Sequence, residues 1–386
     1  MAIKKIEIMK TKGKIKILQT IRQGQVGGGE THVFDLTKEL DKSRFDIEVL
    51  SFTDGPMVEK LNSIGIKTHI IETERPFDLT IWSKVFDLIK TNDYDIIHAH
   101  GTRAASNVFY ATNKLKKPLI YTVHGWSFHE GQRPIIRRIR ELSEKFLTKK
   151  ADLTIAVSNS NQREGIVKFG LQRSKVIYNG VDAVKFNPDS MYKDIRTEFG
   201  IPESKTLVAF LARMTFQKDP LTMVRAIELV STVTKDVIFL MVGSGEMFEE
   251  TKKLAIELGV LDQIVFSEFR NDIPDILKAT DIYCLPSLWE GMPIGLLEAM
   301  FMNKACIATG VDGSAELIES EINGKLVPKK NHLLLATAIL DLHRDIKKRS
   351  AFSSNAGIYA RENFSLIRMV KEIESVYNEY NVLNNL

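Results

Sequence analysis

At 386 residues, the chain is too long for one ordinary hydrophobic core, so two domains are expected. Its 44% hydrophobic and 26% charged residues are typical of a soluble globular protein, and no apolar run approaches the roughly 18 residues that a membrane span needs. The basic start of the chain lacks the apolar segment of a signal peptide, which predicts a cytoplasmic protein.

The charge is distributed unevenly along the chain. Residues 1–180 hold 30 Lys and Arg against 20 Asp and Glu, whereas the remainder holds 23 against 29. This asymmetry indicates that the first half faces an anionic partner. The two cysteines, Cys284 and Cys306, each lie in an apolar run, where we expect buried reduced thiols without a metal role.

Apolar, strand-like runs alternate with helical patterns throughout the first half. Continuous apolar strands separated by helices are typical of parallel sheets that are covered on both faces. The strands expected in this half are 15–21, 45–52, 66–71, 95–100, 118–125 and 153–158, and helices are expected at 31–40 and 81–90.

The second half repeats this scheme, so the chain is predicted to form two doubly wound α/β units. Its expected strands are 206–213, 237–243, 263–269, 281–286 and 304–310. The turn-forming segment 178–190 follows the strand-like KVIY and is predicted to be the linker. The final segment, 364–383, is predicted to be a helix with one apolar face, made of Ile367, Val370, Ile373, Tyr377 and Tyr380.

The segment 133–150 combines basic residues with an apolar stripe at helical spacing. The basic residues are Arg133, Arg137, Arg138, Arg140, Lys145, Lys149 and Lys150, and the stripe is Ile135, Ile136, Ile139, Leu142 and Phe146. Such a helix can lie on an anionic membrane surface, or its stripe can pack on a sheet as in an ordinary surface helix. The sequence leaves both interpretations open. Nucleic acid is not expected as a partner, because interleaved aromatic residues are missing.

A glycine-rich turn, Gly27-Gly28-Gly29, follows the first expected strand and precedes a helix expected to start near Thr31. Such a turn lets the backbone approach a ligand and aims helix N–H groups at an anion, although a tight turn alone is the alternative. The dinucleotide pattern G-x-G-x-x-G fails here and in VGSGEMF (242–248), which argues against a dehydrogenase.

Candidate binding residues also follow the strands of the second half. Arg213 and Lys218 lie five residues apart after one strand, and a forked guanidinium with an ammonium suits a diphosphate. Gly243 and Gly245 follow the next strand and are expected to approach a nucleotide. Arg270 and Asn271 follow another, where backbone groups can read a base edge.

Two glutamates eight positions apart, Glu290 and Glu298, flank a predicted helix start. An anion held by the unpaired N–H groups there would have one carboxylate on each side. This arrangement suits a nucleotide-sugar, which has two hydroxyl-rich ends joined by a pyrophosphate. The alternative, a pair of solvated glutamates, fits less well because Glu298 lies between Leu297 and Ala299 in an apolar helix.

Three histidines, His98, His100 and His124, lie in strands of the first half, and His124 ends its strand before Gly125, facing the interdomain space. No metal site is predicted, because the trio lacks carboxylate partners at metal-ligand spacing. The D-x-D pattern at residues 93–95 lies at the amino end of a strand, so it is interpreted as a solvated turn.

Six motifs in order resemble the retaining glycosyltransferases of family 4: GGGE (27–30), TVHG (122–125), NGVD (179–182), LARMTFQKD (211–219), VGSGE (242–246) and EGMPIGLLE (290–298). The resemblance covers nearly the whole chain and implies the GT-B fold, with two Rossmann-like domains facing a central cleft. It implies an acceptor-binding domain at 1–179, a nucleotide-sugar-binding domain at 180–363, and a helix at 364–386 that crosses back to the first domain. One departure is Met292, where many members carry phenylalanine.

The resemblance also implies roles for single residues. Arg213 and Lys218 would hold the donor diphosphate and stabilise the leaving charge. Glu298 would bind the ribose, Glu290 the sugar hydroxyls near the reacting carbon, and His124 would approach the donor sugar. Further expected donor contacts are Gly28 and the backbone N–H groups of Ile294, Gly295, Leu296 and Leu297. No metal and no cofactor are expected, since the nucleotide-sugar is itself a substrate.

The leading hypothesis is a retaining, metal-independent hexosyltransferase. It would move a sugar from a nucleotide-sugar, expected to be a UDP-sugar, to a lipid-linked or saccharide acceptor in cell-surface polysaccharide synthesis. The basic first half predicts peripheral contact with the inner face of the membrane. One alternative is a nucleotide-sugar 2-epimerase of the same fold, for which Glu30 is the obvious acid/base candidate. The other is a nucleotide-sugar-binding protein without turnover, against which the set Arg213, Lys218, Glu290 and Glu298 argues.

Overall fold

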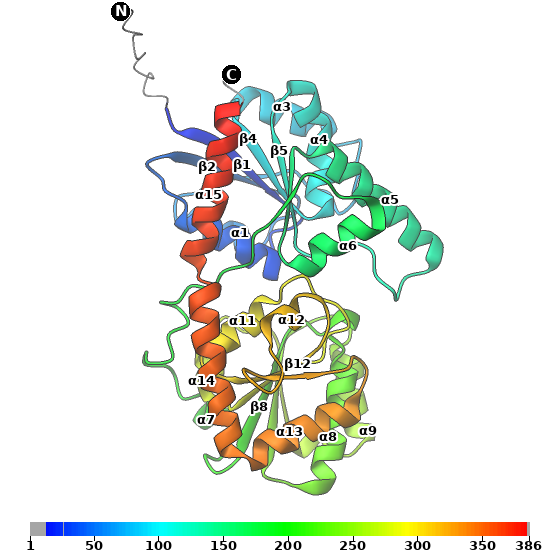
Figure 1. The fold of residues 1–386 in the computed structure, drawn as a ribbon, viewed down its shortest axis with the longest axis vertical. Helices are drawn as coiled ribbons and strands as arrows, with labels where there is room; N and C mark the ends of the chain where they lie inside the picture. Colours follow the sequence, from blue (N-terminus) through cyan, green and yellow to red (C-terminus); the bar gives the residue numbers. More distant parts are fainter. Residues whose placement is uncertain (1–12, 26, 384–386) are drawn as a thin grey trace, which may run out of the picture.

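Two α/β units follow one another along the long axis of the computed structural model, which describes residues 13–25 and 27–383 (Figure 1). The first unit holds a seven-stranded sheet of order β3-β2-β1-β4-β5-β6-β7, and the second a six-stranded sheet of order β10-β9-β8-β11-β12-β13. Every paired strand in both sheets is parallel. The predicted pair of doubly wound units is confirmed. The basic start of the chain, residues 1–12, lies outside the described residues.

The first unit alternates strands and helices as the apolar pattern predicts. Its elements are β1 (Ile15–Ile21), α1 (Gly28–Glu39), β2 (Phe45–Ser51), α2 (Pro56–Ser63), β3 (Lys67–Ile70), α3 (Trp82–Asn92), β4 (Ile96–His100), α4 (Thr102–Leu115), β5 (Leu119–Val123), α5 (Pro134–Lys150), β6 (Leu153–Ala156), α6 (Asn159–Phe169) and β7 (Ser174–Val176).

The remaining elements follow β7 in the chain, and all of them except α15 belong to the second unit. They are α7 (Ile195–Glu198), β8 (Thr206–Leu211), the 3₁₀ turn η1 (Phe216–Lys218), α8 (Pro220–Val233), β9 (Val237–Val242), α9 (Phe248–Glu257), η2 (Leu261–Gln263), β10 (Ile264–Ser267), α10 (Ile273–Ala279), β11 (Ile282–Leu285), α11 (Ile294–Phe301), β12 (Ala305–Thr309), α12 (Asp312–Leu317), β13 (Lys325–Val327), α13 (His332–Arg344), α14 (Ile346–Asn363) and α15 (Leu366–Leu383). The sequence did not predict β13, which has only three residues.

The strand order reverses once in each sheet, between β1 and β4 in the first and between β8 and β11 in the second. The loops that follow two such neighbouring strands run to opposite faces of the sheet and leave a crevice between them. Open α/β sheets bind ligands in this crevice. The Gly27–Gly29 turn follows β1, Arg213 follows β8 and Glu290 follows β11. The topology therefore gathers the predicted residues at the two crevices.

The last helix, α15, packs against the first unit rather than the second (Figure 1). Its buried face consists of Leu366, Met369, Val370, Ile373, Val376 and Tyr377. The prediction that Ile367 belongs to this face is wrong, because its side chain is 62% exposed. Where α15 begins, the Val181 amide donates to the Phe364 carbonyl (2.9 Å) and the Leu366 amide to the Val181 carbonyl (3.0 Å), so the two chain crossings between the units are joined.

Helix α5 turns its apolar stripe outward. Ile135 is 70% exposed, Ile139 58% and Leu142 50%. The buried side is instead held by Glu144, whose carboxylate accepts hydrogen bonds from the hydroxyls of Thr102, Ser127 and Tyr121. The interpretation that the stripe packs on a sheet is therefore wrong.

The D-x-D segment is a structural turn, as its position in the sheet predicts. Asp93 pairs with Lys117 (2.7 Å), and Asp95 accepts the Lys16 amide (2.8 Å). The middle residue departs from the prediction of a solvated turn, because Tyr94 is buried and donates its hydroxyl to Glu48. Both cysteines are buried and free, as expected. Among the helices that the structure describes, none combines the length and the apolar character that crossing a bilayer requires.

Candidate functional site

The N-terminus of α11 has no side-chain cap. Pro293 precedes the helix and supplies no side-chain cap. The Leu297 amide already donates to the Pro293 carbonyl (3.2 Å), so this one of the four predicted phosphate-binding amides is engaged. The amides of Ile294, Gly295 and Leu296 have no acceptor among the described residues. Unpaired N–H groups at the positive end of a helix dipole form an anion site.

A second helix N-terminus faces the first across the boundary between the units. Helix α1 begins at Gly28, three residues earlier than expected, because the glycines form its first turn instead of a preceding loop. A Cβ placed on Gly28 would lie 3.9 Å from Cδ1 of Ile294, the first residue of α11. The positive ends of both helices therefore meet at one place (Figure 1).

The backbones of the two units touch beside the N-termini of α1 and α11. A Cβ on Gly291 would lie 2.0 Å from the His124 carbonyl oxygen, and one on Gly313 would lie 2.0 Å from the Gly291 oxygen. Gly125 has φ 150° and faces the Gly291 amide. Side chains are excluded at these positions, so the loop before α11 lies directly against the end of β5.

Lys218 and Glu290 form an ion pair beside the α11 N-terminus. The Glu290 carboxylate is 5% exposed and the Lys218 side chain 17%, and the Glu290 amide donates to Asp312 Oδ2 (2.9 Å). Arg213 is exposed, and its guanidinium has no ion-pair or hydrogen-bond partner within the described part of the chain. Of the two cations predicted to bind a diphosphate, Lys218 is thus paired with a carboxylate, and Arg213 is free to contact a ligand.

Glu298 lies one turn inside α11 and is half-buried, and its carboxyl group has no hydrogen-bond partner in the described ranges. Burial raises its carboxyl pKa to about 7, Lys185 opposes this rise and Asp35 adds to it. Asp35, on the facing α1, has its own pKa raised to about 6, also by burial. A half-buried carboxyl group without a partner is suited to accept hydrogen bonds from ligand hydroxyls.

His124 follows β5 and lies beside α1. A Cβ on Gly29 would be 3.4 Å from its Cδ2, so the glycine makes room for the ring. Burial lowers the pKa of His124 well below the ordinary histidine value, which leaves the ring neutral at physiological pH. Its Nε2 lies 3.1 Å from Nδ1 of His100.

The glycines after β9 serve the protein backbone directly. Gly243 has φ 145° and Gly245 φ 155°, and Cβ atoms there would lie 2.0 Å from the Ala212 oxygen and 2.3 Å from the Met214 oxygen. They let the loop after β9 lie against the loop that carries Arg213. Whether they also contact a nucleotide stays a prediction.

The Arg270 side chain is committed to carboxylates. It pairs with Glu198 (2.6 Å) and with Asp272, and these partners raise its pKa. Asn271 accepts from Lys60 of the first unit at 3.4 Å. The side chains at both positions are thus engaged within the protein, and the expected contact of their backbone with a base stays a prediction.

Two residues beside the candidate site, His32 and Asn179, were not predicted from the sequence to have a role there. His32 on α1 is buried, and Asn179 connects it to the second unit by accepting at Oδ1 from His32 Nδ1 (3.0 Å) and donating from Nδ2 to the Met292 carbonyl (3.0 Å). The motif NGVD marked Asn179 only by position, and no local pattern marked His32. Glu30, the epimerase candidate, is 3% exposed and pairs with Arg22 (3.3 Å).

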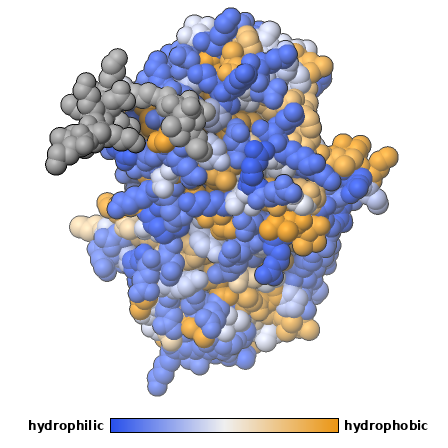
Figure 2. All heavy atoms as spheres, turned by 45° about the horizontal axis from the view of Figure 1, so that its top comes forward, coloured by the Kyte–Doolittle hydropathy of each residue, from blue (hydrophilic) through white to orange (hydrophobic). Residues whose placement is uncertain are grey.

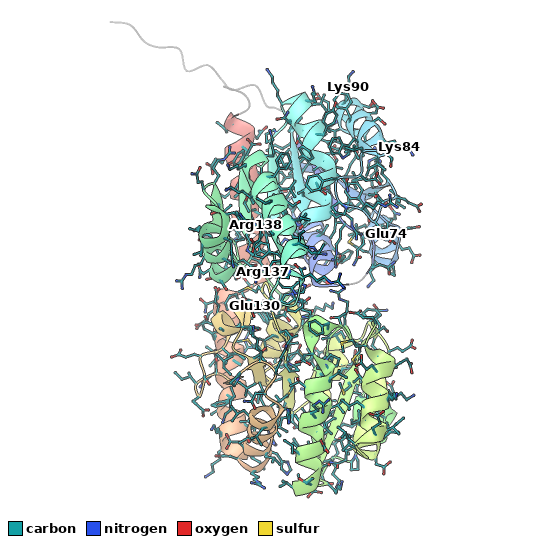
Figure 3. All side chains as sticks on the ribbon, turned by 90° about the vertical axis from the view of Figure 1, so that its right-hand side faces the viewer. Glu74, Lys84, Lys90, Glu130, Arg137 and Arg138 are labelled. Atoms are coloured by element: carbon teal, nitrogen blue, oxygen red, sulfur yellow. The ribbon has the colours of Figure 1, made fainter. Side chains whose placement is uncertain are left out.

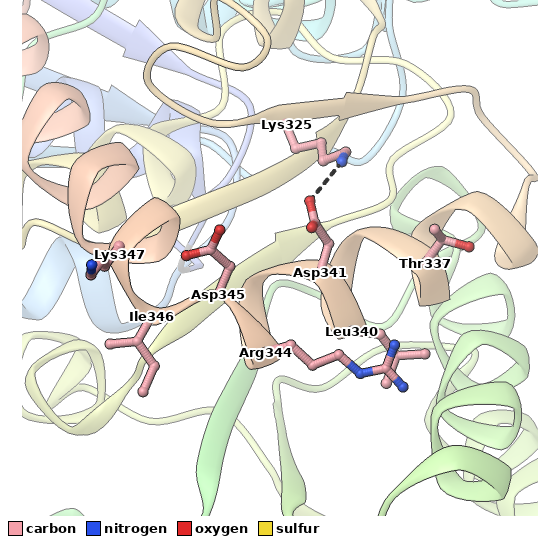
Figure 4. Close-up of a pocket in the computed structure, with 8 residues that line it drawn as sticks. All are labelled: Lys325, Thr337, Leu340, Asp341, Arg344, Asp345, Ile346 and Lys347. Atoms are coloured by element: carbon pink, nitrogen blue, oxygen red, sulfur yellow. Dashed lines mark hydrogen bonds and ion pairs between the residues drawn. The ribbon is translucent and has the colours of Figure 1, made fainter.

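A surface hollow in the second unit lies apart from this site. Figure 4 shows it at the junction of α13 and α14, lined by Lys325, Thr337, Leu340, Asp341, Arg344, Asp345, Ile346 and Lys347. Lys325 (3.0 Å) and Lys348 (2.9 Å) both pair with Asp341, so its central charges are neutralised within the protein. We assign it no functional role.

Two family models match successive parts of the chain. The model of Glycosyltransferase Family 4 matches residues 26–185, and that of Glycosyl transferases group 1 matches residues 191–357. The boundary between the matches falls in the segment that joins the two units.

Similar curated proteins match over nearly the full length. The chain is 26% identical to the UDP-Gal:alpha-D-GlcNAc-diphosphoundecaprenol alpha-1,3-galactosyltransferase of Escherichia coli, covering 95% of this chain and 97% of the relative. It is 25% identical to the N-acetyl-alpha-D-glucosaminyl L-malate synthase of Bacillus anthracis, covering 93% and 95%.

Solved structures of glycosyltransferases share the fold. Anabaena HepE, solved in complex with UDP and glucose, superposes with a TM-score of 0.84 at 24% identity, covering 95% of this chain and 100% of the other. WaaG, a glycosyltransferase involved in lipopolysaccharide biosynthesis, superposes with a TM-score of 0.76 at 16% identity, covering 94% and 99%. The two-unit architecture is the GT-B fold of these proteins.

Proposed function

Since this chain belongs to glycosyltransferase family 4, we propose that it moves a hexose-type sugar from a UDP-sugar to a lipid-linked or saccharide acceptor, with retention at the reacting carbon and without a required metal. The observation that carries this proposal is the uncapped N-terminus of α11, which has Glu290 on one side and Glu298 on the other. The Escherichia coli relative, by its name, uses UDP-Gal and a lipid-diphosphate acceptor.

The donor diphosphate is proposed to lie on the amides of Ile294, Gly295 and Leu296, with Arg213 closing over it. The α11 dipole and two cations, Arg213 and Lys218, stabilise the negative charge that develops on the leaving diphosphate. These fixed charges do the work that a divalent cation does in other phosphate sites, which is the physical basis for metal independence.

Glu298 is proposed to bind the ribose hydroxyls, because it is the half-buried carboxyl group one turn away from the phosphates. Glu290 reaches the sugar hydroxyls on the opposite side. Its pairing with Lys218 makes it a poor nucleophile, since the ammonium holds its negative charge. Retention is therefore proposed to occur without a protein nucleophile, with the departing phosphate deprotonating the acceptor on the same face of the sugar.

The acceptor is proposed to be presented at an anionic membrane surface that α5 contacts. Figure 2 shows apolar side chains at the outer edge of the first unit, on the side where α5 projects in Figure 1. Figure 3 places Arg137 and Arg138 on this surface, with Glu130 near the boundary between the units. Exposed isoleucines next to arginines are typical of helices that lie in a lipid headgroup region.

A donor screen tests the assignment. Thermal unfolding is followed with UDP, GDP, ADP and their common sugars, with and without magnesium, and products are then identified by mass spectrometry. We expect UDP and one UDP-sugar to raise the midpoint equally with and without magnesium, since a ligand of the folded state stabilises it. In the product analysis, we expect the same UDP-sugar to donate its sugar to a polyprenyl-diphosphate-linked saccharide.

The same screen separates the alternatives. An epimerised nucleotide-sugar would indicate the 2-epimerase, and binding without donor hydrolysis would indicate a binding protein. The pairing of buried Glu30 with Arg22 does not favour the epimerase, because an acid/base residue needs access to the substrate. No stabilisation by any nucleotide would contradict the proposed function.

A further inference from the structure

Three histidines from separate elements of the first unit converge beside the α11 loop. His32 comes from α1, His100 ends β4 and His124 follows β5, and one ring nitrogen of each lies within 4.8 Å of the other two. The rings of His32 and His124 are 4.8 Å apart and those of His100 and His124 5.3 Å. The proposed transfer reaction uses only His124.

The hydrogen bonds of Asn179 fix the tautomer of His32. Asn179 Nδ2 donates to the Met292 carbonyl, which can only accept, so its Oδ1 faces His32 Nδ1. Nδ1 of His32 therefore carries the proton, and Nε2 presents a lone pair. This Nε2 atom is buried and has no partner among the residues that the structure describes, while the side chain as a whole is 3% exposed. A buried ring nitrogen without a partner is costly unless something binds it.

The tautomer of His100 is fixed in the same way, by the side-chain amide of Gln19. Gln19 Nε2 bonds the Tyr377 hydroxyl (2.6 Å), and Gln19 Oε1 lies 2.8 Å from His100 Nε2. In this arrangement His100 donates from Nε2 and points the lone pair of Nδ1 at His124. His98, which the sequence grouped with these histidines, is turned away and bonds Tyr377 and Thr122 instead.

We propose that His32, His100 and His124 form a binding site for a zinc-class transition-metal ion. Bonds of about 2.1 Å to a tetrahedral ion place two nitrogens about 3.4 Å apart, close to the 3.1 Å between His100 and His124. His32 must move inward by about an ångström to complete the set. Ligating histidines in proteins usually donate their other N–H to a carboxylate or carbonyl oxygen, and the amide oxygens of Asn179 and Gln19 supply this.

The protonation states also fit a metal. The hydrogen bonds to Asn179 and Gln19 put the ring protons of His32 and His100 on Nδ1 and Nε2, which leaves Nε2 of His32 and Nδ1 of His100 with a lone pair for an ion. His124 binds through Nε2 by shifting its proton to Nδ1, so no net proton is released. Three imidazoles select zinc, cobalt, nickel or copper over magnesium and calcium, which prefer oxygen ligands.

The metal would act on the transferase as an inhibitor, and this part rests on the proposed function. A bound ion fixes His124 away from the donor sugar and holds His32, which is joined through Asn179 to the backbone just before α11. Zinc would therefore inhibit transfer, whereas magnesium would not. Metal binding itself does not depend on the transferase assignment.

The test is a cobalt titration of full-length protein prepared without a histidine tag. Tetrahedral cobalt gives intense visible absorption, and zinc added afterwards should abolish it by displacement. We expect one ion per chain, with affinity at least about 100-fold weaker in His32→Gln and in His124→Gln. His332→Gln, at an exposed histidine of α13, should bind cobalt like the wild type.

Far-UV circular dichroism checks that each variant is folded, and either of the two ligand variants suffices for the test. Absence of stoichiometric cobalt binding to the wild-type protein would overturn the proposal, as would equal affinity in a folded His32→Gln or His124→Gln protein. A zinc-binding protein with no transferase activity would leave the metal site standing and refute the proposed function alone.

Discussion

Gly291 lies against the His124 carbonyl so closely that a Cβ on the glycine would come within 2.0 Å of the oxygen. The contact joins the loop before α11 in the second unit to the end of β5 in the first. A substitution there must push the two units apart. It would also displace His124 from the proposed donor site.

We therefore predict that Gly291→Ala reduces kcat/KM by about 100-fold or more, since a shift of about 1 Å in a catalytic group has this effect. Steady-state transfer assays measure the change. The matched control is Gly310→Ala, where the nearest atom to a new Cβ is 3.9 Å away. Equal activities of the two variants would show that this contact does not position the site.

The Lys218–Glu290 pair provides a second prediction. Removing Lys218 leaves the 5% exposed Glu290 carboxylate without its partner, so Lys218→Ala should lower the free energy of unfolding by about 3 to 5 kcal/mol. Adding Glu290→Gln should restore much of this stability and none of the activity. Denaturant unfolding and transfer assays measure the two effects.

The control for this pair is Lys253→Ala. Lys253 is 77% exposed and pairs with Glu257 at 3.7 Å on the surface of α9, so its loss should change stability by no more than about 0.5 kcal/mol. If Lys218→Ala were equally neutral, the ion pair would not be the buried interaction described above.

The raised pKa of Glu298 makes both stability and donor binding depend on pH. Because its folded-state pKa is about 7 against an ordinary 4.5, the folded protein keeps a proton that the unfolded chain releases. The resulting stability is fully present below pH 4.5 and is lost as the pH rises through about 7. Glu298→Gln should abolish this loss of stability. The difference between the stability–pH profiles of the wild-type and variant proteins gives the contribution of Glu298, because Asp35 is present in both.

Donor affinity should change in the opposite direction. Ribose hydroxyls donate to the ionised carboxylate, so UDP should bind the wild-type protein more tightly as the pH rises through about 7. Isothermal titration calorimetry between pH 5.5 and 8.5 measures this. If the UDP affinity of Glu298→Gln varied with pH in the same way as that of the wild type, Glu298 would be excluded from the ribose site.

Membrane contact through α5 is tested by vesicle co-sedimentation. Ile135→Ser with Ile139→Ser removes two exposed apolar groups, 70% and 58% accessible, without touching the buried side of the helix. We expect partitioning onto anionic vesicles to fall by about 10-fold or more, since each buried isoleucine contributes about 1.5 to 3 kcal/mol. Ile346→Ser, 64% exposed on α14, is the control. Equal partitioning of all three proteins would refute the membrane surface.

The sequence predicted the fold well because strands buried on both faces are continuously apolar. The segment 281–286, for example, corresponds to β11 at Ile282–Leu285, with all four residues buried. The three-residue β13 is too short to show a pattern. The orientation of α5 could not be predicted, because its buried side is polar and is held by Glu144 through partners distant in the sequence.

The arrangement of the residues around the start of α11 could also be predicted from the sequence in part. Glycine and proline mark the start of the helix in the sequence. This start places Glu290 in the loop before the helix and Glu298 about one turn inside it. The Lys218–Glu290 pair spans 72 positions, and the bond from Asn179 to Met292 spans 113, so neither leaves a local signal. His32 shows no pattern in the sequence, because its role depends on strands β4 and β5 lying beside α1.

The proposed function requires a nucleoside diphosphate to lie on the N-terminus of α11 under Arg213. The most direct test is calorimetric titration of wild-type, Arg213→Met and Arg225→Met proteins with UDP and with uridine. Arg225 is an exposed arginine of α8 and serves as the control. We predict that Arg213→Met weakens UDP binding about 10-fold or more, as expected for a lost charge-assisted contact of about 1.5 to 3 kcal/mol, and leaves uridine binding unchanged. Equal UDP affinity in all three proteins would contradict the placement of the diphosphate under Arg213.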